Sequence, residues 1–219
     1  AFKVMYVVVA IPARLKSSRL PNKVLAEIGG VPMIKRVLNQ CSKAELIDEL
    51  FLCTDDEFLN NKAIEWGFRS IITSKNCDSG SSRIASVIDQ LTLTNKLEDS
   101  LIINVQGDQP FINPEVIDQM VIFANSKKEI PNVITPIYKI KNKDIHDPNL
   151  VKTLVTSEKE IIYFSRSAVP FIRDREKVLW KSLYQYWGHV GIYGYRGDIL
   201  KRWNSFPDSE LEKLEKLEQ

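Results

Sequence analysis

The sequence VVVAIPARLKSSRLPNKVL, from Val7 to Leu25, passes abruptly from an apolar run to a cationic segment. Residues Val4 to Ile11 are apolar and rich in β-branched side chains, which is typical of a strand buried on both faces of a parallel sheet. No acidic residue precedes Glu27. This local excess of positive charge at the end of a strand predicts an anionic ligand. The cations that follow the apolar run are Arg14, Lys16, Arg19 and Lys23.

Parallel strands need helical crossovers, and the sequence that follows supplies them. Residues 32–44 carry an apolar stripe at helical spacing, and Pro32 suits a first helical turn. The resulting alternation of strand and helix predicts a doubly wound, mostly parallel α/β sheet that binds ligands at the carboxyl ends of its strands. Further strands are expected at 49–56, 69–74 and 100–110, further helices at 57–67 and 114–126, and a loop that becomes a helix within 77–91.

The alternation stops after Ile130. Residues 132–140 and 150–166 read as antiparallel strands, the second a hairpin that turns near 157–159. We therefore expect a smaller antiparallel lobe or dimerisation arm within 131–187. The length of 219 residues fits a single α/β domain that contains this insertion and spans 1–219.

The last segment, 209–219, places Leu211, Leu214 and Leu217 in register and predicts an amphipathic helix. The chain ends inside this helix without a capping signal, which is the pattern of an incomplete sequence.

Composition excludes several classes of protein. The formal net charge of +2 is too small for the basic field of a dedicated nucleic-acid binder. No run approaches the roughly 18 apolar residues of a membrane span, and the opening strand leads into charge rather than into a cleavage site. Cys41, Cys53 and Cys77 are widely spaced, so we expect buried thiols in a cytoplasmic protein rather than disulfides or a zinc site.

The cationic loop differs from the common glycine-rich phosphate loops. Neither GxxxxGK[ST] nor GxGxxG occurs in the chain, which argues against a P-loop kinase and a dinucleotide-binding fold. Instead the loop offers Ser17, Ser18 and its long cations, which suit charge-assisted hydrogen bonds to a polyphosphate. The alternative is a solvated basic turn, and the position of the loop at a strand end counts against it.

The stretch IPARLKSSRLPNKVL resembles the signature PARxxSxRLPxKxL of the enzymes that make CMP-activated acidic sugars, above all the 3-deoxy-manno-octulosonate (KDO) cytidylyltransferases. The resemblance continues, in the family's order, through SGSSR, NVQGDQP, DPNLVK, YFSRSAVP, HVGIYGYR and SELEKLEKLEQ. It implies a fold of the nucleotide-diphospho-sugar transferase type and a cytoplasmic homodimer. It also implies that CTP and KDO react, with Mg²⁺, to give CMP-KDO and pyrophosphate for lipopolysaccharide-type glycan biosynthesis.

The resemblance also implies roles for single residues. Arg14 and Lys23 would hold the triphosphate and stabilise charge as pyrophosphate leaves, and Asp108 would be a ligand of Mg²⁺. The implied nucleotide contacts are Ala13, Arg19, Arg83 and Gln106, the last of which could instead serve the sugar. The implied sugar-binding residues are Arg166, His189, Tyr193, Glu218 and Gln219. The family's second metal carboxylate is expected beyond the last residue given.

Two departures from the family pattern leave alternatives open. Gln109 stands where most members have Glu, and Ser82 stands where an acidic residue is common. Ser81 or Ser82 could equally cap a helix. The same chemistry on amino-KDO or a sialic-acid-like sugar remains an alternative, as does CTP binding without turnover. The aromatic residues Trp180, Tyr184, Tyr186 and Trp187 could form a stacking surface for single-stranded nucleic acid, or else a core or a subunit interface.

Overall fold

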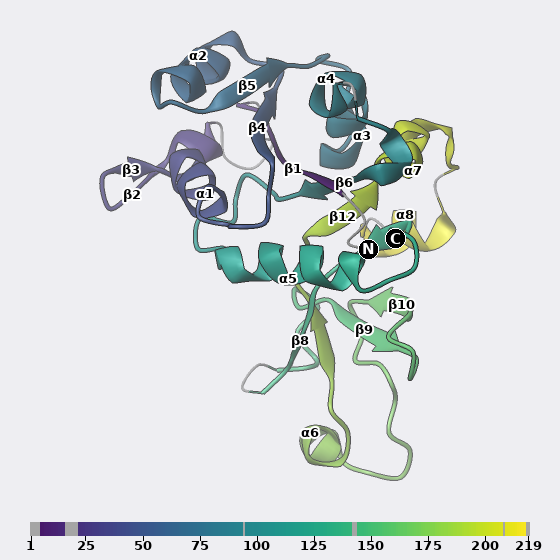
Figure 1. The fold of residues 1–219 in the computed structure, drawn as a ribbon. Helices are drawn as coiled ribbons and strands as arrows, with labels where there is room; N and C mark the ends of the chain where they lie inside the picture. The colour runs from purple at the N-terminus through teal and green to yellow at the C-terminus, as the bar shows by residue number, and fades with distance from the viewer. Residues whose placement is uncertain (1–4, 16–21, 94, 142–143, 208, 218–219) are drawn as a thin grey trace. The chain divides into compact units, whose positions relative to one another are not determined.

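The structure is a computed structural model that describes residues 5–15, 22–93, 95–141, 144–207 and 209–217. The chain divides into two compact units, each formed from segments that are distant in the sequence (Figure 1). Unit 1 consists of Ala1–Ile134 and Gly191–Phe206, and unit 2 consists of Thr135–Val190 and Pro207–Gln219.

Unit 1 contains a six-stranded sheet in the order β5-β4-β1-β6-β12-β7. Strands β5, β4, β1 and β6 are parallel, and β12 runs antiparallel between β6 and β7. The direction of strand addition reverses beside β1, because β4 and β5 lie on one side of it and β6 on the other. The predicted doubly wound, mostly parallel sheet is confirmed. The strands are β1 Tyr6–Ala13, β4 Glu49–Thr54, β5 Arg69–Ile72, β6 Ser100–Asn104, β7 Val133–Ile134 and β12 Tyr193–Arg196.

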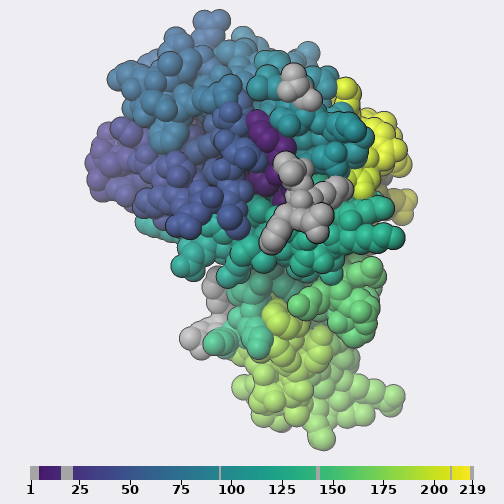
Figure 2. All heavy atoms as spheres, in the orientation of Figure 1, coloured from purple at the N-terminus to yellow at the C-terminus, as the bar shows by residue number. Residues whose placement is uncertain are grey.

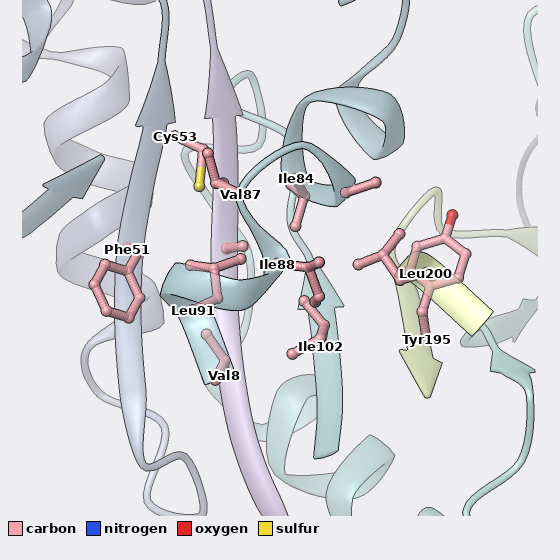
Figure 3. Close-up of a cluster of buried hydrophobic side chains, with 12 residues drawn as sticks. Val8, Phe51, Cys53, Ile84, Val87, Ile88, Leu91, Ile102, Tyr195 and Leu200 are labelled. Atoms are coloured by element: carbon pink, nitrogen blue, oxygen red, sulfur yellow. The ribbon is translucent and has the colours of Figure 1, made fainter. Parts of the chain in front are cut away.

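Strand β1 is buried on both faces, as its composition predicts. Val8 and Ala10 belong to a core cluster with residues of helices α3 (Gly80–Ala85) and α4 (Ile88–Thr92) (Figure 3). The alternate residues, including Val9, point to the opposite face and are equally buried. The space-filling view shows only a narrow purple band of this segment between the blue and teal parts of unit 1 (Figure 2).

Two of the remaining helices of unit 1, α2 and α5, begin at a side-chain cap. Asp56 accepts a hydrogen bond from the backbone of Leu59 at the start of α2, and Asn113 caps α5 in front of Pro114. Pro32 lies in β3, one residue before α1, rather than in the first helical turn. These elements are α1 Met33–Cys41, α2 Glu57–Glu65, α5 Pro114–Asn125, α7 Gly197–Lys201, β2 Glu27–Ile28, β3 Val31–Pro32, and the 3-10 helices η1 Lys23–Leu25, η2 Leu97–Asp99 and η4 Trp203–Ser205.

The helix expected to follow a loop within 77–91 is divided into α3 and α4. Val87, between them, has φ −122° and ψ 16°, which is not helical. Its side chain and those of Ile84, Ile88 and Leu91 are nevertheless buried together, as their spacing predicts. The apolar face is therefore preserved across the break.

Unit 2 contains an antiparallel sheet in the order β10-β9-β11-β8, which confirms the expected antiparallel lobe. Strands β9 and β10 form the predicted hairpin, and Lys159 in its turn has a positive φ of 65°. Trp180 and Tyr186 are buried in a small core beside this sheet, so these two aromatic residues are not a stacking surface. The elements are β8 Ile137–Lys139, β9 Lys152–Val155, β10 Ile161–Ser165, β11 Trp187–His189, η3 Lys177–Leu179, α6 Trp180–Leu183 and α8 Glu210–Glu215.

The terminal helix α8 starts at Ser209, whose hydroxyl accepts a hydrogen bond from the backbone of Glu212. Its predicted apolar stripe is largely exposed, since Leu211 is 47% and Leu214 is 79% accessible. Across the part of the chain that the structure describes, every helix is too short or too polar to cross a membrane.

Truncation of Ile102 should test the core around β1 and β6. Ile102 is fully buried, so Ile102→Ala should lower the free energy of unfolding in urea by about 2–5 kcal/mol. Ile122 is 58% exposed on α5, and the control Ile122→Ala should change it by less than about 0.5 kcal/mol. Equal effects of the two substitutions would contradict this assignment of the core.

Candidate active site

The site expected from the sequence lies at the carboxyl ends of β1 and β6. Strand β1 ends at Ala13, whose partner on β4 is Thr54, and β6 ends at Asn104. Because the strand order reverses between these two strands, the chain segments that follow them diverge and leave a place for a ligand.

The cationic loop leaves β1 at Arg14, whose side chain is exposed. Its two ends meet where the backbone N–H of Asn22 donates to the carbonyl of Leu15 over 3.0 Å. Asn22 adopts a left-handed conformation with φ 58°, and the chain then enters η1 at Lys23. The residues between them, 16–21, include Arg19, whose predicted nucleotide contact lies outside the described residues.

The structure brings two of the predicted catalytic residues together. The Lys23 ammonium lies 2.8 Å from a carboxylate oxygen of Asp108, although 85 positions separate them in the sequence. Both side chains remain about half exposed, at 41% and 49%. A cation and a carboxylate that are both accessible at a strand end can contact a phosphate and its metal ion, respectively.

Close backbone packing fixes the turn that carries Asp108. A Cβ atom added to Gly107 would lie 3.3 Å from the carbonyl oxygen of Pro12 and 3.5 Å from Cβ of Ala13. A Cβ atom added to Gly80 would lie 2.9 Å from Pro12 Cγ and 3.3 Å from Nε2 of Gln106. The end of β1, the turn after β6 and the start of α3 therefore converge, and with them Ala13, Gln106 and Asp108.

A chain of buried polar groups orients Gln106. Its side-chain amide nitrogen donates to Oδ1 of Asn104 over 3.3 Å, and the amide of Asn104 donates to Oγ of Ser81 over 3.2 Å. Ser81 Oγ in turn lies 3.0 Å from the hydroxyl of Tyr195. Asn104 and Ser81 are fully buried. Buried polar groups are costly unless they are satisfied, so this chain of bonds favours one orientation of the Gln106 amide.

The side chain of Arg83 is buried beneath the carboxyl ends of the strands and is not exposed there. Its side chain is only 4% exposed and forms an ion pair with Asp55 at 3.2 Å. The same guanidinium donates to the hydroxyl of Thr73 and to the carbonyl of Ser74. Arg83 thus ties the carboxyl ends of β4 and β5 to α3. The ion pair of Asp55 with Arg83 was not predicted, although Asp55 lies in the strand segment expected at 49–56.

The helix cap expected at Ser81 or Ser82 is Ser79. Its hydroxyl accepts from the backbone of Ser82 over 3.0 Å, so Ser79 is the N-cap of α3, which starts at Gly80. Ser81 is instead a member of the buried polar chain.

Tyr193, a predicted sugar-binding residue, also belongs to unit 1. It is the register partner of Asn104 on the neighbouring strand, and its ring stacks on that of Tyr195 with centroids 5.9 Å apart. It therefore lies beside the same strand end as Gln106.

The other predicted sugar-binding residues belong to unit 2. Nε2 of His189 lies 2.8 Å from the hydroxyl of Thr135, and its ring packs on Phe164 with centroids 4.5 Å apart. Burial lowers the pKa of His189 to about 4, so the imidazole is neutral at physiological pH. The side chain of Arg166 contacts the end of α8. Glu218 and Gln219 lie outside the described residues.

The cysteines are buried and unpaired with one another. Burial raises the pKa of both Cys41 and Cys53 to about 12, so these thiols stay neutral. Within the described residues there is no group of three or more His, Cys, Asp or Glu side chains that could hold a metal ion. Asp108 is an accessible carboxylate in the turn after β6.

Comparison with known proteins agrees with this geometry. A family model described as cytidylyltransferase matches residues 8–219. The 3-deoxy-manno-octulosonate cytidylyltransferase of Thermodesulfovibrio yellowstonii is 38% identical over 221 residues, covering 98% of this chain and 85% of that protein. The 8-amino-3,8-dideoxy-manno-octulosonate cytidylyltransferase of Shewanella putrefaciens is 40% identical over 217 residues, covering 98% and 84%.

A solved structure extends the likeness to three dimensions. The structure of a CMP:2-keto-3-deoxy-manno-octonic acid synthetase complexed with CTP superposes with a TM-score of 0.86 at 32% identity, covering 97% of this chain and 83% of that one. The match of family model, near full-length relatives and fold shows that the chain belongs to the family of 3-deoxy-manno-octulosonate cytidylyltransferases.

Proposed function

We propose that this protein transfers CMP from CTP to the anomeric hydroxyl of KDO and releases pyrophosphate. The observation that carries the proposal is the accessible Lys23–Asp108 pair at the point where the strand order reverses. Phosphoryl-type transfer depends mainly on positioning and on stabilisation of charge, and an enzyme of this type needs no nucleophilic side chain.

In the proposed reaction the anomeric oxygen bonds to the α-phosphorus of CTP, and the proton of the hydroxyl passes to the solvent. The bond from the α-phosphorus to the bridging oxygen breaks, and pyrophosphate takes the bonding electrons. Arg14 and Lys23 stabilise the negative charge that develops on the departing pyrophosphate. The buried polar chain that ends in Gln106 holds a hydrogen-bonding amide beside the same strand end.

The residues fit a magnesium ion shared between protein and substrate. Mg²⁺ is commonly held by one or two carboxylates together with substrate phosphates and water. Asp108 supplies one such carboxylate, is half exposed and engages Lys23 through one oxygen only. When bound, the ion would neutralise charge on the phosphate oxygens. Asp108 is therefore the residue proposed to hold it.

The residues proposed to bind the sugar comprise neutral hydrogen-bonding groups and one cation. In unit 2, the neutral His189 suits a hydroxyl of a sugar, and Arg166 suits its carboxylate. In unit 1, Tyr193 is by its chemistry a further donor or acceptor for a hydroxyl. Amino-KDO is the second candidate acceptor, because the relative in Shewanella putrefaciens carries that name.

The proposal extends to a cytoplasmic homodimer that serves lipopolysaccharide-type glycan synthesis. Unit 2 carries large apolar side chains that are exposed within the single chain, which is what a surface awaiting a partner subunit would show. The most exposed are Ile162, Phe171, Val178, Leu183 and Leu214.

Pyrophosphate release tests the proposed function directly. The protein, in its full length and with CTP and Mg²⁺, should release pyrophosphate when KDO is added. Amino-KDO and sialic acid, offered separately, should react more slowly because a changed hydroxyl contact leaves buried polar groups unpaired. A preference for amino-KDO would move the assignment to that acceptor, and CTP binding without any release would indicate a binding protein.

Removal of the charge on Asp108 should abolish most activity. Asp108→Asn keeps the shape of the side chain but loses the carboxylate, so kcat should fall by at least about 100-fold. Asp89→Asn is a matched control, because Asp89 forms an ion pair of the same 2.8 Å length with Lys201 on the surface. Both changes should alter stability by less than about 1 kcal/mol. Normal turnover in Asp108→Asn would refute the role of Asp108.

Burial of His189 should make stability depend on pH. The pKa of His189 is about 4 in the folded protein against 6.5 for the free side chain, so the unfolded chain binds the proton first as the pH falls. The free energy of unfolding should therefore fall by up to about 3 kcal/mol as the pH drops from 6.5 to 4. Above pH 7 this group should cause no loss of stability. His189→Gln should flatten the dependence of the unfolding free energy on pH in that window. Parallel curves for the two proteins would contradict the burial of a neutral imidazole.

A further inference from the structure

Arg166 is held in place by hydrogen bonds at both its backbone and its side chain. Its backbone N–H donates to the carboxylate of Glu215 over 2.8 Å, and its carbonyl accepts from the ammonium of Lys152. Its Nε donates to the carbonyl of Glu215 over 2.6 Å. The two terminal nitrogens donate to the carbonyls of Pro148 and Lys216, over 2.9 and 3.3 Å. Few conformations of this side chain are compatible with all of these bonds.

These bonds leave part of the guanidinium available. A guanidinium carries five N–H hydrogens, and in Arg166 three of them point to carbonyl oxygens. One hydrogen therefore remains on each terminal nitrogen. Within the described residues no carboxylate oxygen lies within 4.0 Å of this guanidinium, although its charge contributes to the lowered pKa of Glu215, so carbonyl oxygens are its direct hydrogen-bond partners. Two free N–H groups on a fixed cation suit a carboxylate, which accepts two parallel hydrogen bonds.

Glu215 is the residue on which this arrangement depends. One oxygen of its carboxylate accepts from the hydroxyls of Tyr163 and Ser165, each over 2.8 Å, and the other accepts from the backbone of Arg166. Burial opposes ionisation of Glu215, but the hydrogen bonds from Arg166, Ser165 and Tyr163 outweigh it and the pKa lies below the ordinary value. The ionised carboxylate thus binds the last turn of α8 to the end of β10.

Lys152 fixes the other side of the arrangement. Its side chain is fully buried, and its ammonium donates to the carbonyls of Asp147, Leu150 and Arg166. These bonds hold the turn that presents the carbonyl of Pro148 to the guanidinium. Arg166 is therefore held between a buried ammonium on one side and the carboxylate of Glu215 on the other.

We infer that Glu215 is a positioning residue, which holds the Arg166 guanidinium so that its two free N–H groups receive the carboxylate of the sugar acid. This inference rests on the proposed function, since it takes the acceptor to be an acidic sugar. The contact with the sugar is made by Arg166, and Glu215 acts only through it.

Glu215→Gln tests the inference, because it keeps the size of the side chain and removes its charge and one acceptor oxygen. The KM for KDO and its dissociation constant in calorimetry should both rise by about tenfold, while the KM for CTP should change less than about twofold. Glu210→Gln is the matched control, an exposed charge in the first turn of the same helix, and should change none of these values. Equal behaviour of the two variants would overturn the inference.

A double substitution separates positioning from a general loss of stability. Arg166→Lys removes the planar fork, so Glu215→Gln added to it should raise the KM for KDO by less than a further twofold or so. Full additivity of the two effects would overturn the inference. Tyr163→Phe removes one donor to the carboxylate and should cause a smaller change in the same direction, which covers the case in which Glu215→Gln fails to fold. Absence of turnover in the unchanged protein with every acidic sugar would refute the proposed function instead.

Discussion

The burial of β1 on both faces is the constraint on which the rest of unit 1 depends. A strand that pairs in parallel with both neighbours needs helical crossovers, and these cover the two faces of the sheet. All the connections that leave the carboxyl ends of the parallel strands then emerge at one edge. This is why Lys23 and Asp108, far apart in the sequence, form an ion pair there. The topology of the sheet thus brings the site residues together, and single contacts then fix their positions.

The groups at this edge divide into those that remain accessible and those that hold them. Lys23 and Asp108 keep about half of their side-chain surface exposed, whereas Arg83 is almost fully buried against Asp55. Breaking a buried pair leaves an uncompensated charge, which costs far more than breaking an exposed one. The Arg83–Asp55 pair is therefore suited to fixing the loops after β4 and β5. The exposed pair can exchange its partners for phosphate and metal at little cost.

Much of the fold could be predicted from the sequence because its signals are local. The unbroken apolar run of β1, the alternation of strands and helices, and the hairpin of β9 and β10 all follow from periodicity and turn chemistry. The split between α3 and α4 at Val87 could not be predicted, because both helices share one apolar face. The roles of Asp55 and Glu215 were missed for another reason. Each depends on a partner that only the folded chain brings near, and an acidic residue on its own is more often a solvated charge or a cap.

The terminal helix shows how such a distant partner can decide local structure. An isolated helix of the six residues of α8 is not stable in water, and its leucines contribute little because Leu211 and Leu214 are exposed within the chain. Polar contacts must therefore hold it, and the described ones converge on Glu215 and Arg166. The carbonyls at its carboxyl end favour a nearby cation, and the guanidinium supplies one. Formation of α8 and positioning of the Arg166 guanidinium consequently depend on each other. A ligand that binds the free N–H groups of the guanidinium therefore also stabilises the helix.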